Sequence, residues 1–368
     1  MKYLVFVLFT VSSFISSLSM AEKWNHEVHG SFPVFFTYSD TDNGEASSQI
    51  MSGFNPANMT ITSMAPTQDG LNISATLQIT SHLQGSKEQN SGLFESRVAE
   101  ITIKGDFGQL NVGKGFGIFN SNAIGDVGSG KGIGHMPNAA DQGNATNGHI
   151  GTGYVYANFN PRIMYTSQLG DSGSYKVGIF NPEEPANPKV ANVEVDIKAE
   201  TALPRFEGQL TMNVSEHSVW AGFMFQSVES LVEDYDIQAF DIGGQLNLGA
   251  MGIRAAYTVT QGIGADGLYG YGGIGDAGVD GSQAYVEGTF KMGAMTYGVS
   301  YGLGTQDSGT NATGAVAEIE NTLAMLFAHK KISDNLHLMF EVQSYSSETS
   351  KVATQEYTAV STGMQVDF

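Results

Sequence analysis

The sequence predicts an all-β protein, a transmembrane antiparallel β-barrel of sixteen strands. Three observations predict it: apolar and polar side chains alternate along segments of about ten residues, short and long links between these segments alternate, and the last segment keeps its pattern up to the final residue, Phe368. A membrane helix would need about 20 consecutive apolar residues, and after residue 21 no apolar run approaches that length.

Composition narrows the class of protein further. The chain has 368 residues, with 17 Lys and Arg against 37 Asp and Glu, and a formal net charge of −20. Such a chain repels polyanions, so we expect no nucleic-acid partner. Without Cys it has no disulfide and no Cys-ligated metal, and 41% hydrophobic residues are too many for a disordered protein. Length alone would suggest two domains, but closed barrels often exceed the usual domain size.

The first 21 residues have the pattern of a secretory signal peptide. Lys2 supplies the charged end, an apolar stretch follows it, and Ser19-Met20-Ala21 fits a small-x-small cleavage site. A buried first helix or a membrane anchor is the alternative, but the stretch is short and interrupted by Ser. We therefore expect residues 1–21 to be a cleaved signal peptide and residues 22–368 to form a single barrel domain.

The alternation starts soon after this segment. The apolar face of the first strand carries Val28, Gly30, Phe32, Val34, Phe36 and Tyr38. The next segment, 59–63, shows only a weak pattern, whereas 71–80 alternates clearly between aliphatic residues and Asn, Ser, Thr or Gln. Successive side chains of a strand point to opposite faces, so each of these segments predicts one apolar and one polar surface.

Four segments in the second half of the chain, 205–214, 240–248, 283–292 and 336–343, alternate in the same way. Their polar faces include the charged residues Arg205, Glu207, Asp241, Glu287, Lys291 and Glu341. Such faces are too polar for a protein core. Alternation alone, however, does not distinguish a barrel with a wet interior from a soluble sandwich with a wet exterior.

The lengths of the links favour the barrel. Short links are expected near 66–69, 105–108, 168–173, 215–217, 249–252, 292–295 and 331–335. Long links are expected near 39–57, 82–92, 115–151, 181–203, 227–236, 260–282, 304–317 and 344–356. Their strict alternation gives sixteen strands with turns at one rim and loops at the other, which is typical of outer-membrane barrels, whereas sandwiches mix their link lengths.

The ends of the strands support this interpretation. Tyr and Phe near strand ends suit the two membrane interfaces. The last segment alternates Thr358, Val360, Met364, Val366 and Phe368 with small or polar residues. A closed barrel has no free edge, so we expect this segment to pair with the first strand over its whole length.

Two stretches resemble the Gram-negative general porins, a family of sixteen-stranded outer-membrane channels. Residues 95–114 are similar to that family's strand–turn–strand run, with Lys-Gly-Asp-Phe-Gly at 104–108 and a final Gly-Lys where Gly-Arg is typical. Residues 160–167 resemble the strand after the third loop, and Phe368 is like the family's terminal residue. The resemblance implies a homotrimer of water-filled barrels and passive diffusion of small hydrophilic solutes.

The resemblance also implies that the third long loop, here 115–151, folds into the lumen and narrows it. In the family, basic residues on the wall face acidic residues on this loop, and the field between them sorts polar solutes. Carried over by motif, the residues of this constriction are Arg97, Lys114 and Arg162 on the wall and Asp126 and Asp141 on the loop.

Strict alternation predicts further lumen-facing residues and conflicts with two of the residues carried over by motif. Arg97 and Lys114 share the parity of apolar neighbours, so each needs a bulge or a place beyond the apolar band to reach the lumen, and Gly113 could supply a bulge for Lys114. By parity, the residues expected to face the lumen are Lys176, Arg205, Glu207, Arg254, Glu287 and Glu341.

We expect neither an enzyme nor a cofactor. The segment from Gly125 to Gly132 nearly matches a phosphate-binding loop, but Gly132 replaces the required hydroxyl and no βαβ unit is predicted around it. The eight His show no metal-ligand spacing. A Ser–His catalytic barrel, such as an outer-membrane phospholipase, would need these groups to converge, and although Ser300 and His337 lie on polar faces, nothing in the sequence links them.

The expected function is a non-specific diffusion channel in the outer membrane. Its expected partners are outer-membrane lipid, lipopolysaccharide and small hydrophilic solutes. An acidic mouth concentrates counter-ions, so we expect a mild preference for cations. One alternative is a substrate-selective channel, which an aromatic track in the lumen would favour, although only Trp220 of the two Trp has a lumen-facing parity. The other alternative is a surface adhesin or a structural barrel.

Overall fold

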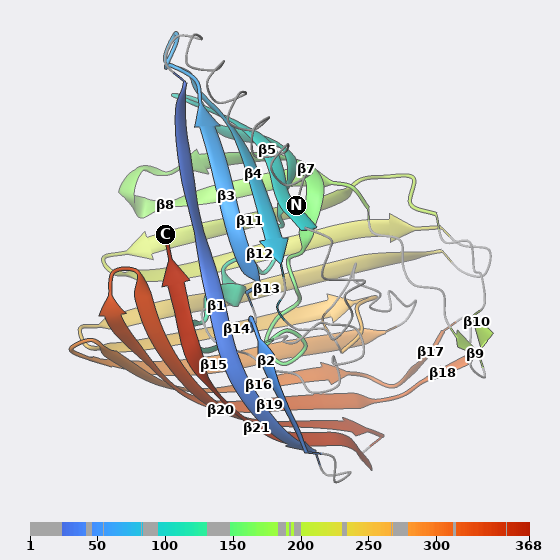
Figure 1. The fold of residues 1–368 in the computed structure, drawn as a ribbon. Coiled ribbons are helices and arrows are strands. Elements are labelled where there is room, and N and C mark those ends of the chain that lie inside the picture. Colours follow the sequence, from blue (N-terminus) through green and yellow to red (C-terminus); the bar gives the residue numbers. More distant parts are fainter. Residues whose placement is uncertain are drawn as a thin grey trace, which may run out of the picture.

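The strands of the computed structural model wrap into one barrel (Figure 1). The structure describes residues 24–368 except 42–45, 54, 82, 84–94, 131–147, 183–188, 191–192, 195–199, 230–233, 266, 268–278, 312–313 and 351. The expected signal peptide therefore lies outside the described residues. None of the helices in the described part is long and apolar enough to cross a membrane.

The strands of the barrel follow one another along the chain. In order they are β1 (Asn25–Thr41), β2 (Ser47–Met51), β3 (Ala57–Met64), β4 (Asn72–Ser81), β5 (Glu95–Gly105), β6 (Gly108–Phe116), β7 (Phe159–Gln168), β8 (Gly173–Phe180), β11 (Arg205–Val214), β12 (His217–Val228), β13 (Tyr235–Leu248), β14 (Met251–Gln261), β15 (Asp280–Met292), β16 (Met295–Gln306), β19 (Ile319–Ser333), β20 (Leu336–Thr349) and β21 (Val352–Asp367).

The remaining elements lie in the links between these strands. They are the short pairs β9 (Lys189–Val190) with β10 (Val193–Glu194) and β17 (Gly309–Asn311) with β18 (Gly314–Val316), and the helices η1 (Ala123–Gly125), α3 (Val127–Gly130) and η3 (Gly170–Ser172). Both strand pairs belong to long links, and η1 and α3 belong to the third of them.

The sheet closes on itself as predicted. Each barrel strand pairs antiparallel with its neighbours, and β2 and β3 pair with successive parts of β1, so they form one interrupted strand and the barrel has sixteen. β21 pairs with β1, and backbone hydrogen bonds between Gly30 and Phe368, of 2.9 and 3.0 Å, join the end of the chain to the first strand. Among the described strands, the barrel therefore leaves no edge open for pairing with another chain.

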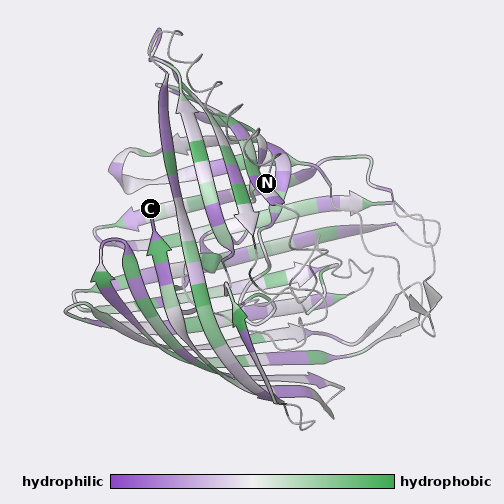
Figure 2. Cartoon of the chain, viewed as in Figure 1, coloured by the Kyte–Doolittle hydropathy of each residue, from purple (hydrophilic) through white to green (hydrophobic). Residues whose placement is uncertain are grey.

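Apolar side chains cover the outside of the barrel, and the inside is largely polar, with buried apolar clusters such as the one that includes Leu323, Met325 and Phe327 of β19. On β13, Ile242 is 62% exposed whereas Asp241 beside it is 4% exposed, and on β15 Val286 is 49% exposed whereas Glu287 is 2% exposed. Hydrophobic and hydrophilic bands alternate along the strands in Figure 2. A soluble sandwich would bury the apolar set, so this arrangement is that of a barrel whose outer surface contacts lipid.

All seven short turns lie where the sequence predicts them. The turns after β13 and β15 are both Gly-Ala pairs, in which Gly249 and Gly293 adopt φ of 68° and 59°. This left-handed conformation is disfavoured for residues with a β-carbon, so glycine allows the chain to reverse within two residues.

Strands extend into two links that the sequence predicts as long. β1 continues to Thr41 and β2 covers Ser47–Met51 within the predicted link at 39–57, and β20 and β21 occupy most of the predicted link at 344–356, up to Thr349 and from Val352. These segments are rich in Ser, Thr and Glu and lack an apolar face. Beyond the lipid both faces of a strand are wet, so backbone pairing continues where the alternation that marks a strand has stopped.

Candidate functional site

The third link joins β6 to β7 and turns into the barrel. It runs over residues 117–158, longer than the predicted 115–151, and the structure describes 117–130 and 148–158. Its hydrogen bonds reach inward-facing side chains of β11, β14, β15 and β16. The expectation that this loop folds into the lumen is met by these contacts.

A buried carboxylate on the wall binds the start of the link. Glu207 accepts hydrogen bonds through Oε2 from the backbone amides of Ile118 and Phe119, at 2.7 and 2.9 Å. Its Oε1 accepts from Nε of Arg205 at 2.9 Å, and both side chains of this ion pair are almost fully buried. Arg205 compensates the charge of Glu207, and the two amides fill the acceptor positions of Oε2.

A second wall carboxylate binds the short helix in the middle of the link. Oε1 and Oε2 of Glu287 accept from the backbone amides of Val127 and Gly128, each at 2.8 Å. These amides belong to the segment that resembles a phosphate-binding loop, and here a carboxylate of the protein occupies them. Residues 131–147 lie outside the described part, so the match to that motif beyond Gly130 is untested by the geometry.

Polar side chains of the link hold the stretch between the two carboxylates. Asn120, at a φ of 58°, accepts a hydrogen bond from the amide of Val155 at 2.7 Å, which ties the outgoing part of the link to the returning part. Asn122 donates to the hydroxyl of Thr211 at 2.8 Å. Asn tolerates the left-handed conformation better than most residues, which explains its use at this bend.

A wall cation also binds the backbone of the link. The guanidinium of Arg254 donates to the carbonyl oxygen of Asn122, to Oε1 of Gln245 and, at 3.1 Å, to the hydroxyl of Tyr285. The Cζ atom of this guanidinium lies 5.0 Å from the centre of the Trp220 ring. These partners are neutral, so they hold the guanidinium in place but do not offset its positive charge.

The returning part of the link packs against β15 and β16. Nε2 of His149 lies 2.9 Å from the hydroxyl of Ser300, and its ring stacks on Tyr285 with 5.4 Å between ring centres. Burial lowers the pKa of His149 to about 4, so the imidazole is neutral at neutral pH. Asp126 accepts from the hydroxyl of Tyr154 at 2.8 Å and is fully buried, so this carboxylate lies within the packed link.

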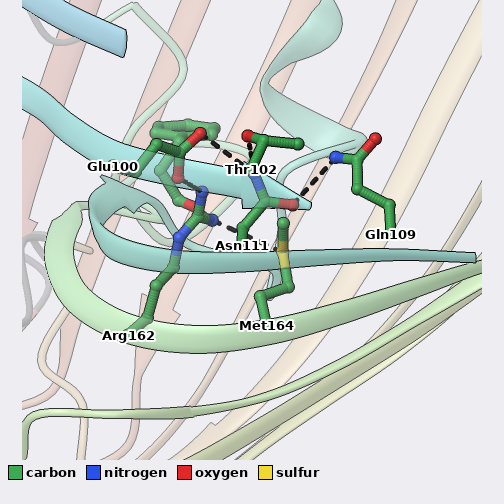
Figure 3. A network of polar contacts seen from close by, with 7 residues as sticks. Glu100, Thr102, Gln109, Asn111, Arg162 and Met164 are labelled. Carbon is green, nitrogen blue, oxygen red and sulfur yellow. Dashed lines mark hydrogen bonds and ion pairs between the residues drawn. The ribbon is translucent and has the colours of Figure 1, made fainter. Parts of the chain in front are cut away.

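Arg162 lies on the inner wall in a polar network that spans three strands (Figure 3). Its Nη2 is 2.6 Å from Oε2 of Glu100 on β5, and Glu100 also accepts from Asn111 on β6 at 3.1 Å. Arg162 donates in addition to the carbonyl oxygen of Phe116, the last residue before the link. The pair therefore joins the wall to the point at which the link departs.

Arg97 and Lys114 lie differently from Arg162. Arg97 is at a register shift between β4 and β5, with its guanidinium 5.6 Å from the centre of the Phe159 ring. Lys114 pairs with Ala99 and Pro161, two exposed positions on the outer side, and the register of β5 with β6 does not shift at Gly113. The structure thus has a β-bulge at Arg97 and none at Lys114, and Lys114 lies on the outer face of β6.

The remaining predicted residues are distributed along the inner wall. Lys176 pairs with the buried Gln209 and shares its inward face. Glu341 is fully buried and lies 3.5 Å from Nε2 of His329. Asp141 lies outside the described residues. Sequence reasoning did not identify Asn120 within the link, or Tyr285 on β15, as residues that hold the link in place, because neither belongs to a motif.

One family profile matches the chain over nearly its whole length. The profile is described as Gram-negative porin and covers residues 8–350. The search of curated proteins found no match.

Solved structures of similar proteins extend over the whole barrel. The outer membrane channel DcaP of Acinetobacter baumannii is 15% identical, with a TM-score of 0.70 over 95% of this chain and 98% of that one. The anion-selective porin from Comamonas acidovorans is 13% identical, with a TM-score of 0.67 over 94% and 100%. In vitro folded OmpT of Vibrio cholerae in its trimer form is 13% identical, with a TM-score of 0.61 over 94% and 100%. At such identities these likenesses concern the fold.

Proposed function

This chain belongs to the Gram-negative porin family, and from this premise we propose that its third link is the constriction of the channel and that the channel prefers cations mildly. Family membership establishes the general function: the protein is an outer-membrane channel for the passive diffusion of small hydrophilic solutes. The proposal concerns which residues control that passage.

The attachment of the link to the wall supports a constriction. Two buried carboxylates, Glu207 and Glu287, each accept two backbone amides of the link, and Arg254 binds it from β14. A loop held at several points across the inside of a barrel reduces the free cross-section and keeps it constant. We propose Arg162, Arg205 and Arg254 as the cations beside the passage, and we place Asp126 within the link itself.

The acidic rim at the long-link end supports the cation preference. In the described part, the carboxylates at this end are Asp40, Glu95, Glu200, Glu229, Asp234, Asp236, Asp280, Asp307, Glu318, Glu320, Glu348 and Glu356. Their spacing along one rim creates a negative potential at the mouth, which raises the local concentration of cations. The effect extends about 8–10 Å at physiological salt.

The ion preference is measured by the reversal potential of single channels in a tenfold KCl gradient. We expect a potential of cation sign and of about 10–30 mV, well below the roughly 59 mV of an ideal cation filter, because the rim charges act through water. The potential should shrink when both KCl concentrations are raised, since salt screens the rim. A potential of anion sign would contradict the proposal.

We also propose that the protein is a homotrimer embedded in outer-membrane lipid and lipopolysaccharide. One similar structure is described as a trimer form, and the outer surface of this barrel is apolar. Cyclic symmetry suits identical barrels that share one membrane plane. We expect a band of three times the monomer mass on gels of unheated samples and conductance steps in groups of three. Monomers that conduct singly in lipid would contradict the trimer.

Two competing functions receive less support. Trp220 donates to Asp241 at 2.9 Å and stacks on Arg254, so it belongs to the wall and not to an aromatic track for substrates. The Ser300–His149 pair is buried where the returning part of the link packs on β16, with Thr152 3.4 Å from the other ring nitrogen, and burial lowers the pKa of His149 to about 4. We propose that this pair fastens the link and has no catalytic role.

A further inference from the structure

A hollow lies between the third link and the short turns of the barrel. Its volume is about 490 Å³, and it is lined by Gly125 and Val127 of the link and by residues of β13, β14, β15, β16, β19 and β20 down to the turns at 249–250 and 294. In outer-membrane barrels the short turns face the periplasm, so this hollow is on the periplasmic side of the constriction.

Cationic and imidazole side chains converge in the part of the hollow nearest the turns. The strand register places Lys291 opposite Thr296 and Thr296 opposite His329, which forms one inward-facing row across β15, β16 and β19. The next row toward the turn has Lys331 opposite His337. Directly opposed residues have β-carbons about 4.5–5.5 Å apart, so the flexible ammonium groups of both rows reach a common space.

A further cation lies at the upper end of the hollow, beside a carboxylate. Arg254 lines the hollow below the link and donates to Gln245, Tyr285 and the carbonyl of Asn122. It stands opposite Glu287 in the strand register, so that carboxylate offsets part of its charge. Lys291 and Lys331 lie at the other end, and the field of these cations in a partly enclosed space is stronger than on an open surface.

Four carboxylates lie near these cations, and none of them occupies the space between the cations. They are Glu287, Asp334, Glu341 and Asp367. Both oxygens of Glu287 already accept amides of the link. Asp334 is 2.7 Å from Lys331, but its side chain is 92% exposed in the turn, where such pairs are weak. Glu341 and Asp367 contact imidazoles, at 3.5 and 3.2 Å. The ion pairs among the described residues do not include Lys291.

We propose that this hollow is a binding site for small multiply charged oxyanions that pass through the channel, with inorganic phosphate as the simplest example. Lys291 and Lys331 supply most of the positive charge and Arg254 the rest, while Thr296 and the second amide hydrogen of Asn247 on its wall offer neutral donors. The inference rests on the channel function proposed above and gives the two ends of the lumen opposite character. The acidic mouth concentrates cations, and the basic hollow beyond the constriction retains anions.

The test uses the full chain in planar bilayers, with KCl as the charge carrier, a buffer at pH 8 and inorganic phosphate added to both sides. The decisive variant is Lys291→Gln with Lys331→Gln. The matched control is Lys330→Gln, because Lys330 stands at the same rim but pairs with Met295 and Leu338 on the opposite face of the strand. The control removes one positive charge without altering the hollow.

Phosphate is expected to reduce the KCl current of the unmodified channel, less strongly as ionic strength rises. The double variant should need at least tenfold more phosphate for the same reduction, whereas Lys330→Gln should respond within twofold of the unmodified protein. An equal response of the double variant would overturn the site. Channels that conduct KCl but ignore phosphate would overturn the site and leave the channel function standing, and a chain that conducts no KCl would overturn both.

Discussion

Replacing Glu287 by Ala is expected to release the middle of the third link from the wall and to raise the single-channel conductance. The variant removes the acceptors of two amides, those of Val127 and Gly128. A hydrogen bond to a charged group contributes about 1.5–3 kcal/mol, so the attachment loses about 3–6 kcal/mol before water compensates part of it. The middle of the link is then expected to leave the wall part of the time, so that the passage fluctuates in width.

The measurement is the mean conductance and current noise of single channels. Glu287→Gln is the graded comparison, because its amide oxygen accepts one of the two bonds while its NH₂ group opposes the other donor. It should fall between the unmodified protein and Glu287→Ala. Glu216→Ala, in the turn between β11 and β12, removes the same charge without touching the link and should leave the noise unchanged. An unaltered current in Glu287→Ala would show that the carboxylate does not hold the link.

Placing a charge on the outer face is expected to destabilise the barrel. Val286 lies halfway along β15, is 49% exposed and points away from the lumen. A Lys at the middle of a lipid-facing strand lowers the free energy of unfolding by about 2–4 kcal/mol, because the ammonium group must leave water. Val286→Lys should show this loss in denaturant titrations of the protein in lipid vesicles.

The control for this variant is Thr289→Lys on the same strand. Thr289 faces inward and lines the hollow below the link, where a new ammonium group stays hydrated although Lys291 and Arg254 carry like charges in the same hollow. Its free energy of unfolding should therefore change by less than about 1 kcal/mol, as for most substitutions in wet surroundings. Equal losses in the two variants would contradict the assignment of the outer face to lipid.

Most of the barrel could be predicted from local pattern. The inward parity of Glu207, Glu287 and Arg205 follows from the alternation, and the structure buries all three on the inner wall. The two links that were predicted too long show where this reasoning ends. Pairing beyond the lipid depends on a neighbouring strand and leaves no apolar period in the sequence.

The charged residues of the candidate constriction were harder to predict. The family motif suggests Arg97 and Lys114 for the lumen, whereas their parity suggests the outside. The strand register shows that the two residues differ. Arg97 lies in a β-bulge, whereas Lys114 lies on the outer face beside Ala99 and Pro161. A single inserted residue reverses the face of every residue beyond it, so such positions depend on the register of the whole ladder.

Alternation along a strand was enough to predict the two faces of most barrel strands, because successive side chains point to opposite sides regardless of what lies nearby. What the inward charges bind became evident only from the folded barrel. Glu207 meets amides of the link 89 and 88 positions away, and Glu287 meets amides 160 and 159 positions away. Curvature and closure of the barrel bring these groups together, and no period in the chain encodes such distances.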